Sequence, residues 1–455
     1  MSNTRTILSI VRCAILCVAA SLLILTACGG DEQVSHGRFA SVSIIHGDSD
    51  AQAVVLFFTD RRLPANTPQL AARLGANRAL VASIDTNRFL DTFAGETSDG
   101  CVRIAGDIDN LSRYIQASNG LSGYRPPILV GVGEGARVVR AALGQSEPGV
   151  FTGGLSLDMT ATGAPAQPLC DADRPTLSAP WFVNVSGQDE GELGPLIADS
   201  PQAKRIDRPT AGNDVSAVID EAMPKLRQRQ ASIMTAAPSG VLSDLPLIEV
   251  PATSDRSNDT MAIVLSGDGG WAGLDKQVGA GLAARGIPVV GYDSLRYYWT
   301  SRTPDEAARD LGRVMDYYRA RWHKSRTLLI GYSYGADVLP FLVNRLPVGD
   351  RDQIARVILL GLAADVRFEF HIWSWLGLGD GGRPVRPEVD QLAPGLAVCI
   401  YGRGDTDSIC DSLNPKQIEL KALAGGHHFD GDYTTLIRSI MDAVPAPHAL
   451  SSSAD

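Results

Sequence analysis

The sequence predicts an α/β protein made of two tandem domains, each with a mainly parallel sheet. The chain has 455 residues, which is more than a single hydrophobic core usually accommodates. Short apolar runs alternate along it with amphipathic helical patterns, and the order of these segments occurs twice. With 44% hydrophobic and 20% charged residues, the composition is that of an ordinary globular protein rather than a disordered or fibrous chain.

The N-terminal segment has the layout of a lipoprotein-type secretory signal at residues 1–28. Two arginines precede the apolar stretch 14–25, which is too short to span a bilayer comfortably. The stretch runs into LTAC, which resembles a lipobox with Cys28 as the acylated residue; ordinary cleavage that leaves a free cysteine is the alternative. We expect a tether at 29–40 and a periplasmic protein anchored through Cys28. The glycine that follows the cysteine favours the outer membrane.

The first domain is expected at residues 41–211. Its apolar runs lack polar alternation, which is typical of parallel strands covered by helices on both faces. The alternating strand and helix segments are 53–60, 67–77, 78–89, 101–116, 126–143 and 180–191.

The second domain is expected at residues 241–447, after a linker at 212–240 and before a tail at 448–455. The linker contains a polar helical pattern and a breaker, TAAPSG. The domain repeats the alternation of the first, as an α/β domain requires. Its segments are 261–267, 274–286, 287–293, 304–322, 327–333, 336–346, 356–363 and 396–402.

Landmarks in the two halves shift almost in parallel. The tetrapeptide DTNR at 85–88 reappears as DSLR at 293–296, which is 208 residues later. Ser333 stands 200 residues after Gly133 in a similar glycine-rich turn. Because both order and spacing are kept, the sequence indicates an internal duplication.

The pentapeptide GYSYG at 331–335 follows an apolar strand and precedes a helical run. This is the context of a nucleophile elbow, in which glycines permit a sharp turn that lifts the central serine above the sheet edge. We therefore predict Ser333 as a nucleophile in an α/β-hydrolase-like domain. The alternative is an incidental serine in a surface turn.

A serine hydroxyl needs a base to take its proton and an acid to orient that base. After such an elbow they follow in the chain order Ser, Asp or Glu, His. Asp405, just past strand 396–402, is the predicted acid, with Asp407 in the same loop as the alternative. His427 and His428 follow a glycine pair. We predict His428 as the base from its place in that turn, with His427 as the alternative.

The glycine-rich turn SGDGGW at 266–271 follows the first strand of the second domain. Backbone amides in such a turn can approach a substrate oxygen. We expect Gly267 and Asp268, with the amide of Tyr334, to form an oxyanion hole. A phosphate cradle is disfavoured, because the turn lacks a P-loop lysine and GxGxxG spacing.

The motifs SGDGGWAGLDK, GYSYGADVLP and GGHHFDGDY together resemble the bacterial virulence protein family called VirJ or AcvB. The likeness covers the second half closely, and the two-copy layout is similar to the longer AcvB type. The resemblance implies a periplasmic serine hydrolase that removes lysine from lysyl-phosphatidylglycerol, with a link to type IV secretion. The lipobox at Cys28 departs from the family pattern.

A cationic aminoacyl ester as substrate would favour acidic neighbours. Asp337, Asp268 and Asp293 lie in or beside loops at strand ends, where ligands bind in such sheets. We take Asp337 and Asp293 as substrate-binding candidates; structural hydrogen bonding is the alternative for each. The aromatic segment 368–379 is a candidate lid over acyl chains, or else a cover of the sheet.

Four cysteines lie outside the signal, in an exported setting where disulfides form. They allow three pairings, and the one that respects the division into halves joins Cys101 with Cys170 and Cys399 with Cys410. None shows zinc-ligand spacing, so we expect no metal and no cofactor.

The expected partner is an aminoacylated membrane phospholipid, and a secretion-system protein is a further expectation from the resemblance. The net charge of -10 counts against a nucleic-acid surface, because a phosphate backbone is bound by clustered Lys and Arg.

The first domain keeps the turn but not the chemistry. Gly133 stands at the elbow, and the histidines of this half, His36 and His46, precede its first clear strand. Asp189 is retained in the acid loop without partners. We predict a catalytically degenerate scaffold or binding module. Its removal should leave hydrolysis of a small soluble ester nearly unchanged while weakening action on membrane lipid or contact with a protein partner. A non-catalytic interaction protein in both halves is the alternative for the whole chain.

Overall fold

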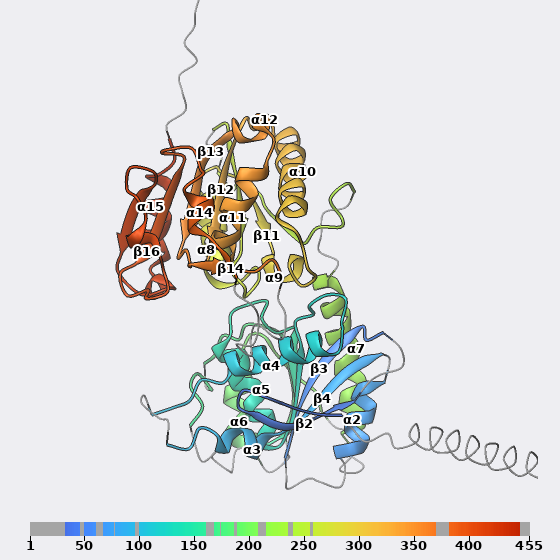
Figure 1. The fold of residues 1–455 in the computed structure, drawn as a ribbon. Coiled ribbons are helices and arrows are strands. Elements are labelled where there is room, and N and C mark those ends of the chain that lie inside the picture. The colour runs from blue at the N-terminus through green and yellow to red at the C-terminus, as the bar shows by residue number, and fades with distance from the viewer. Residues whose placement is uncertain are drawn as a thin grey trace, which may run out of the picture.

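The structure is a computed structural model, and Figure 1 shows two α/β bodies in succession along the chain. No helix in the part that it describes combines the length and hydrophobicity needed to cross a membrane. The described residues are 32–45, 50–60, 67–76, 78–95, 100–160, 168–172, 174–185, 189–207, 215–234, 240–254, 258–369 and 382–445.

The first domain contains an eight-stranded sheet in the order β1-β2-β4-β3-β5-β6-β7-β8. All neighbouring pairs from β4 to β8 are parallel, whereas β1 and β2 are antiparallel to their neighbours. The strands are β1 Glu32–His36, β2 Phe39–Ile45, β3 Ala53–Thr59, β4 Ala79–Asp85, β5 Ile128–Val132, β6 Gly153–Met159, β7 Trp181–Val185 and β8 Ala203–Arg205. The helices are α2 Thr67–Gly75, α3 Thr86–Asp91, α4 Ala105–Ser118, α5 Glu134–Gln145, α6 Glu190–Ala198 and α7 Ser216–Met234.

The second domain contains a seven-stranded sheet in the order β17-β16-β13-β12-β10-β11-β9. Only β9 is antiparallel to its neighbour. The strands are β9 Leu247–Val250, β10 Thr260–Leu265, β11 Val289–Tyr292, β12 Arg326–Tyr332, β13 Ile354–Leu360, β16 Ala397–Gly402 and β17 Glu419–Leu423, with a separate pair of β14 Asp365–Val366 and β15 Arg383–Pro384. The helices are α8 Gly273–Ala283, α9 Ser294–Tyr297, α10 Pro304–Trp322, α11 Tyr334–Arg345, α12 Val348–Arg351, α14 Arg386–Val389, α15 Tyr433–Met441 and the 3₁₀ turns η2 Cys410–Ser412 and η3 Phe429–Gly431.

The two sheets have the same topology. Each strand of one sheet has a counterpart in the other, in the same order and direction. The corresponding orders are β2-β4-β3-β5-β6-β7-β8 and β9-β11-β10-β12-β13-β16-β17. Helices α2 and α7 cover one face of the first sheet and α4 and α5 the other. In the second domain α8 and α15 cover one face, and α10 and α11 the other. The predicted fold class, two tandem α/β domains with mainly parallel sheets, is confirmed.

The echo between DTNR and DSLR has a structural cause. Asp85 and Asp293 are the N-cap residues of α3 and α9, and each accepts a hydrogen bond from the backbone N–H three residues later, at 3.0 and 3.1 Å. A carboxylate cap satisfies an N–H that has no partner within the helix. The duplicated tetrapeptide therefore preserves the same turn after the second parallel strand of each sheet.

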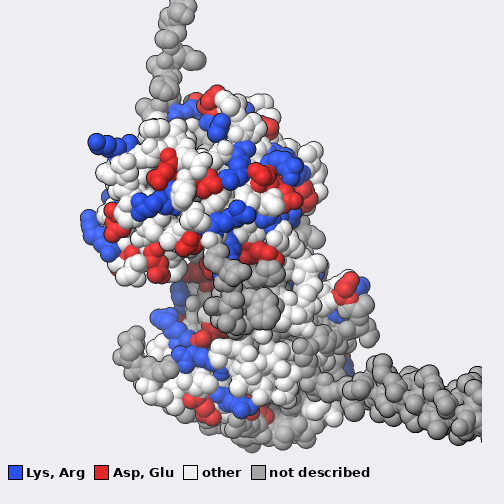
Figure 2. All heavy atoms as spheres, in the orientation of Figure 1, with Lys and Arg blue, Asp and Glu red and all other residues white. Residues whose placement is uncertain are grey.

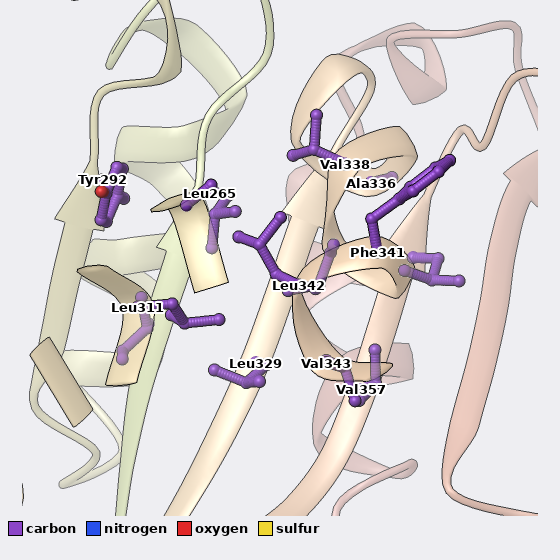
Figure 3. Packing of buried hydrophobic residues seen from close by; sticks show 14 of the residues in the cluster. Leu265, Tyr292, Leu311, Leu329, Ala336, Val338, Phe341, Leu342, Val343 and Val357 are labelled. Carbon is purple, nitrogen blue, oxygen red and sulfur yellow. The ribbon is translucent and has the colours of Figure 1, made fainter. Parts of the chain in front are cut away.

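Packing of α11 on its sheet holds the elbow that precedes it. Figure 3 shows Leu342 and Val343 of α11 next to Leu329 of β12 and Val357 of β13. All four are at most 3% exposed. Burial of each such side chain stabilises the fold by about 1.5–3 kcal/mol. The helix that begins directly after Ser333 is thus fixed on the sheet.

The structure corrects the predicted domain limits at both ends of the first domain. The expected tether at 29–40 includes β1, which pairs with β2 at the edge of the sheet. The expected linker at 212–240 includes α7, which buries Val218, Ala222 and Leu226 against the sheet. These residues recur at helical spacing and so form one apolar side of α7. That side covers the same face of the sheet that α15 covers in the second domain.

Both disulfides form within domains, Cys101 with Cys170 and Cys399 with Cys410. This is the pairing that respects the division into halves. Figure 2 shows positive and negative side chains interspersed on the described surface of the second domain. That face therefore carries both positive and negative charge, without a large patch of one sign. Cys28 and the rest of the signal lie outside the described residues.

Candidate active site

The turn at GYSYG is a strained strand-to-helix elbow. Ser333 lies between β12 and α11 with φ 51° and ψ −121°, a conformation that side-chain-bearing residues rarely adopt. A Cβ on Gly331 would lie 2.3 Å from the carbonyl oxygen of Gly335, and a Cβ on Gly335 would lie 2.2 Å from that of Leu265. Both flanking positions therefore require glycine, and the serine is half-buried at the carboxyl edge of the sheet.

The acid pairs with the first histidine of the glycine-rich turn and not with the second. His427 Nδ1 lies 2.7 Å from Asp405 Oδ2, and the Asp405 side chain is 3% exposed whereas that of His427 is 33% exposed. This geometry reverses the preference for His428 that the sequence suggested. With Nδ1 facing the carboxylate, Nε2 of His427 is the ring nitrogen left for a proton from the nucleophile.

Gly361 connects the elbow to this histidine. The Ser333 N–H donates to the carbonyl of Leu360 at 2.8 Å, and Gly361 follows with φ 65°. A Cβ on Gly361 would lie 2.9 Å from Cε1 and 3.1 Å from Nδ1 of His427. The absence of a side chain at this position brings the imidazole close to the strand end beside the elbow. The sequence reasoning missed Gly361, although its place directly after a buried strand was a usable signal.

His428 has a different partner. Its Nδ1 lies 2.6 Å from the hydroxyl of Tyr332, which is the residue before the nucleophile. Burial and the neighbouring His427 lower the pKa of His428. The hydrogen bond between His428 and Tyr332 thus ties the glycine-rich turn to the residue before Ser333.

The acid loop is held at several points. The backbone N–H of Asp407, the alternative acid, donates to Asp405 Oδ1 at 3.3 Å, and Asp407 itself is exposed. The disulfide from Cys399 in β16 to Cys410 in η2 closes the loop that carries both aspartates. Asp405 is therefore the better-placed acid of the two.

The glycine-rich turn after β10 faces the elbow. A Cβ on Gly267 would lie 3.5 Å from the Ser333 Cβ, so the backbone of this turn approaches the nucleophile closely. Burial raises the pKa of the Asp275 carboxyl, and this effect outweighs the nearby backbone amides, which lower that pKa. The turn that carries Gly267 and Asp268 therefore meets the N-terminus of α11 at the elbow, where we expect the amides of this turn and of Tyr334 to face a substrate oxygen.

The two substrate-binding candidates both have structural roles. Asp337 Oδ1 accepts the backbone N–H of Ala363 at 2.7 Å, and burial raises the pKa of Asp337 to about 8. Asp293 caps α9 as described above, and burial raises its pKa. Asp268, by contrast, is exposed on the turn beside the elbow. It is the acidic side chain of the three that solvent reaches freely.

The aromatic segment lies mostly outside the described residues, which stop at 369 and resume at 382. Phe368 is described and is 6% exposed, packed between Phe341 and Tyr298 with ring centroids at 5.3 and 5.7 Å. This first residue of the predicted lid thus belongs to the core. Among the described residues, no group of His, Cys, Asp and Glu has the arrangement of a metal site.

The first domain has the same elbow without a nucleophile. Gly133 has φ 58° and ψ −113°, close to the values at Ser333. A Cβ on Gly133 would lie 2.5 Å from Asp60 Oδ2, which also accepts the N–H of Glu134 at 3.1 Å. The Asp60 carboxylate therefore occupies the space beside the elbow where a serine side chain and a substrate oxygen would lie.

Comparison with known proteins agrees with the sequence motifs. The family model described as bacterial virulence protein (VirJ) matches residues 259–447, which contain Ser333, Asp405 and both histidines. The resemblance is confirmed over this part of the chain. No curated protein matches the chain significantly.

Several solved structures are similar to part of the chain. Est1E from Butyrivibrio proteoclasticus is 14% identical, covers 43% of this chain and 91% of its own, and has a TM-score of 0.33. An α/β serine hydrolase without lid from Xanthomonas campestris is 15% identical, with coverages of 44% and 89% and a TM-score of 0.30. An α/β serine hydrolase homologue from Coxiella burnetii is 12% identical, with coverages of 44% and 91% and a TM-score of 0.31.

Proposed function

We propose that the chain is a serine hydrolase that cleaves the aminoacyl ester of an aminoacylated phosphatidylglycerol, with lysyl-phosphatidylglycerol as its substrate. The observation that carries the proposal is the hydrogen-bonded pair of Asp405 and His427 beside the elbow of Ser333. An acid, a base and a strained nucleophile at one sheet edge are the parts that acyl transfer to water requires.

In the first half of the reaction Ser333 Oγ attacks the carbonyl carbon of the ester while His427 Nε2 takes the hydroxyl proton. Asp405 accepts the hydrogen bond from Nδ1–H and so holds the tautomer and stabilises the imidazolium. The amides of Asp268 and Tyr334 donate to the oxyanion that develops.

The tetrahedral intermediate then breaks the ester C–O bond. His427 returns its proton to the departing phosphatidylglycerol hydroxyl, and the amino acid stays as an ester on Ser333. Water attacks this ester with His427 again as the base. The products are a free amino acid, phosphatidylglycerol and the regenerated serine.

Charge near the site supports a cationic acyl group. The exposed carboxylate of Asp268 lies on the turn beside Ser333, where it can meet the ammonium groups of a lysyl ester. The resemblance of the motifs in this domain to the VirJ or AcvB family implies the same substrate class.

We further propose that the protein works in the periplasm, tethered to the outer membrane through acylated Cys28. The two disulfides and the lipobox in the sequence support this location, because disulfides persist in oxidising compartments. In a cell fractionation the wild type should sediment with membranes, and Cys28→Ala should move to the soluble periplasmic fraction. A wholly soluble wild type would contradict the tether.

The test of the activity is incubation of the protein with vesicles of lysyl-, alanyl- or unmodified phosphatidylglycerol, followed by lipid separation and amino-acid detection. We expect release of lysine by the wild type and at least about a thousandfold less by Ser333→Ala. A fluorophosphonate probe should label the wild type but not the variant. If the wild type is neither labelled nor active, the chain is an interaction protein, for example one that serves a secretion system.

A further inference from the structure

The first domain touches the turn that carries the oxyanion donors. Helix α4 lies on the side of the first domain that faces the second (Figure 1). Arg113 in this helix donates from Nη1 to the backbone carbonyl of Asp268 at 2.9 Å. Asp268 is the residue whose amide is proposed to meet the substrate oxygen. A side chain from one copy of the duplication therefore bonds to the reactive turn of the other.

Arg113 is held rigidly on its own domain. Its Nη2 donates to Asp109 Oδ2 at 2.5 Å, one helical turn earlier, and the hydroxyl of Tyr124 donates to the other oxygen of Asp109 at 2.8 Å. The Arg113 and Asp109 side chains are only 12% and 14% exposed. Burial acts to lower the pKa of Arg113, but the attraction of Asp109, Tyr124 and Asp268 outweighs it and raises that pKa, so the guanidinium stays charged.

Further contacts join the two domains around this bond. Tyr124 packs against Leu295 and Trp299 of the second domain in a shared buried cluster. The Trp299 Nε1–H donates to the carbonyl of Leu121 at 2.8 Å, and Lys276 donates to the carbonyl of Pro148. The Arg113 contact is thus part of a packed joint and not an isolated surface contact.

The turn that Arg113 contacts needs such support. It contains three glycines, at 267, 269 and 270, and glycine gives the backbone more conformational freedom than any other residue. An oxyanion donor acts only when its N–H is aimed at the place where the charge develops. A charge-assisted hydrogen bond to the carbonyl of the same residue restricts the position and tilt of the adjoining peptide groups.

We propose that Arg113 is a positioning residue for the oxyanion hole, through which the first domain completes the active site of the second. This inference rests on the proposed hydrolase function. It replaces the expectation that the first domain can be removed without effect on the hydrolysis of a small ester. The degenerate copy then has a role in the reaction although it has no nucleophile.

The test compares full-length Arg113→Met and Arg113→Lys with the wild type on p-nitrophenyl butyrate. A donor used mainly in the transition state should change kcat rather than KM. We expect about a tenfold fall in kcat for Arg113→Met with KM within about twofold, and an intermediate kcat for Arg113→Lys, which keeps the charge. The matched control is Arg103→Met, which removes an ion pair to Asp171 from a side chain that is 72% exposed and should leave kcat unchanged.

Thermal unfolding separates positioning from general damage. If Arg113→Met does not fold, the test uses Arg113→Lys and Tyr124→Phe instead. Tyr124→Phe removes the hydrogen bond to Asp109, which holds Arg113. The criterion is again a fall in kcat with KM nearly unchanged. A folded variant with wild-type kcat, or with a raised KM alone, overturns the inference. If the wild type itself is inactive and unlabelled at Ser333, the proposed function fails and this inference with it.

Discussion

At the scale of single residues, the central assignment is which of two adjacent histidines acts as the base. His427 faces Asp405 and His428 faces Tyr332. We expect His427→Ala to lower kcat for ester hydrolysis by at least about a thousandfold, as loss of a triad member does. His428→Ala should lower kcat by about tenfold or less, because it removes only a bond that supports the turn.

The two variants are compared in the same assay, with Tyr332→Phe as the control for the supporting bond. Tyr332→Phe should match His428→Ala if that hydrogen bond is the whole contribution of His428. A greater loss in His428→Ala than in His427→Ala would reverse the assignment.

Asp337 provides a prediction about pH. Its folded-state pKa of about 8 lies above the ordinary value of 3.8, so between these values the unfolded chain loses a proton that the folded chain keeps. Stability from this group is therefore lost as pH rises from about 4 to about 8. Asp337→Asn keeps an acceptor for the Ala363 N–H and removes the ionisation.

We expect the melting temperature of Asp337→Asn to exceed that of the wild type by an amount that grows between pH 5 and pH 8.5. A gain of about 1 kcal/mol corresponds to about 2–4 °C in a domain of this size. The measurement is thermal unfolding across this pH range in matched ionic strength. A difference that stays constant with pH would show that the buried carboxyl does not titrate there.

The sequence was sufficient for some residues of the site and not for others. Ser333 and Asp405 are fixed by local context, since an elbow and a strand-end acid follow from motifs. The choice between two adjacent histidines depends on the direction of each ring, which Gly361 and Tyr332 set from distant strands. That tertiary information is not contained in the GGHH turn.

At the scale of elements, the acid loop between β16 and η2 depends on a disulfide. The bond joins Cys399 to Cys410, which are 11 residues apart and both fully buried. Cys399→Ala with Cys410→Ala should lower the free energy of unfolding by about 2–3 kcal/mol. It should also lower kcat, because Asp405 would no longer be held against His427.

The matched control is Cys101→Ala with Cys170→Ala, which removes the other disulfide from the first domain. It should lower stability without a comparable fall in kcat, and both pairs are measured by denaturant unfolding and by ester hydrolysis. Equal effects of the two pairs on kcat would mean that the acid loop holds its shape without the bond.

The predicted elements differ from the observed ones where a segment is recognised only by what it packs against. The sequence predicts a connector at α7, because charged and amide side chains interrupt its apolar positions and a breaker follows it. Its buried side chains, among them Val218 and Leu226, can be recognised as a core face only once the sheet beneath them is known. Strand β1 is similar, since it is defined by pairing with β2 and not by an apolar run.

At the scale of the whole molecule, one fold is used twice with opposite chemical outcomes. Gly135 lies against the carbonyl of Phe58, and Gly335 lies against that of Leu265, so Phe58 and Leu265 are equivalent positions. Two residues further along each chain segment, Asp60 therefore corresponds to Gly267. The N–H of Gly133 donates to the carbonyl of Leu157 in β6, and the N–H of Ser333 donates to that of Leu360 in β13. The residues that follow these acceptors, Asp158 and Gly361, are therefore equivalent.

These two differences explain the division of labour. In the second domain both positions are glycine, which leaves space for the nucleophile and for the imidazole of His427. In the first domain both carry aspartate. The duplication could be predicted from order and spacing, whereas the Arg113 contact between the copies could not, because no local pattern marks it.

The last prediction concerns the restoration of a serine to the first domain. In a Ser333→Ala background, Gly133→Ser should give no ester hydrolysis, since Asp60 already accepts the N–H of Glu134 and no histidine among the described residues has a place like that of His427. The substitution should also lower the free energy of unfolding by about 1–3 kcal/mol, because φ is 58° and the new Cβ meets Asp60.

Two companion variants test the physical reason. Adding Asp60→Gly to Gly133→Ser should restore part of the stability, because it removes the 2.5 Å contact, yet still give no activity. At the active elbow, Ser333→Gly should be more stable than Ser333→Ala, because glycine adopts a φ of 51° without strain while alanine does not. Thermal unfolding and fluorophosphonate labelling measure both effects. Labelling of the introduced serine, or a more stable Ser333→Ala, would mean that the elbows are not strained in the way the dihedral angles indicate.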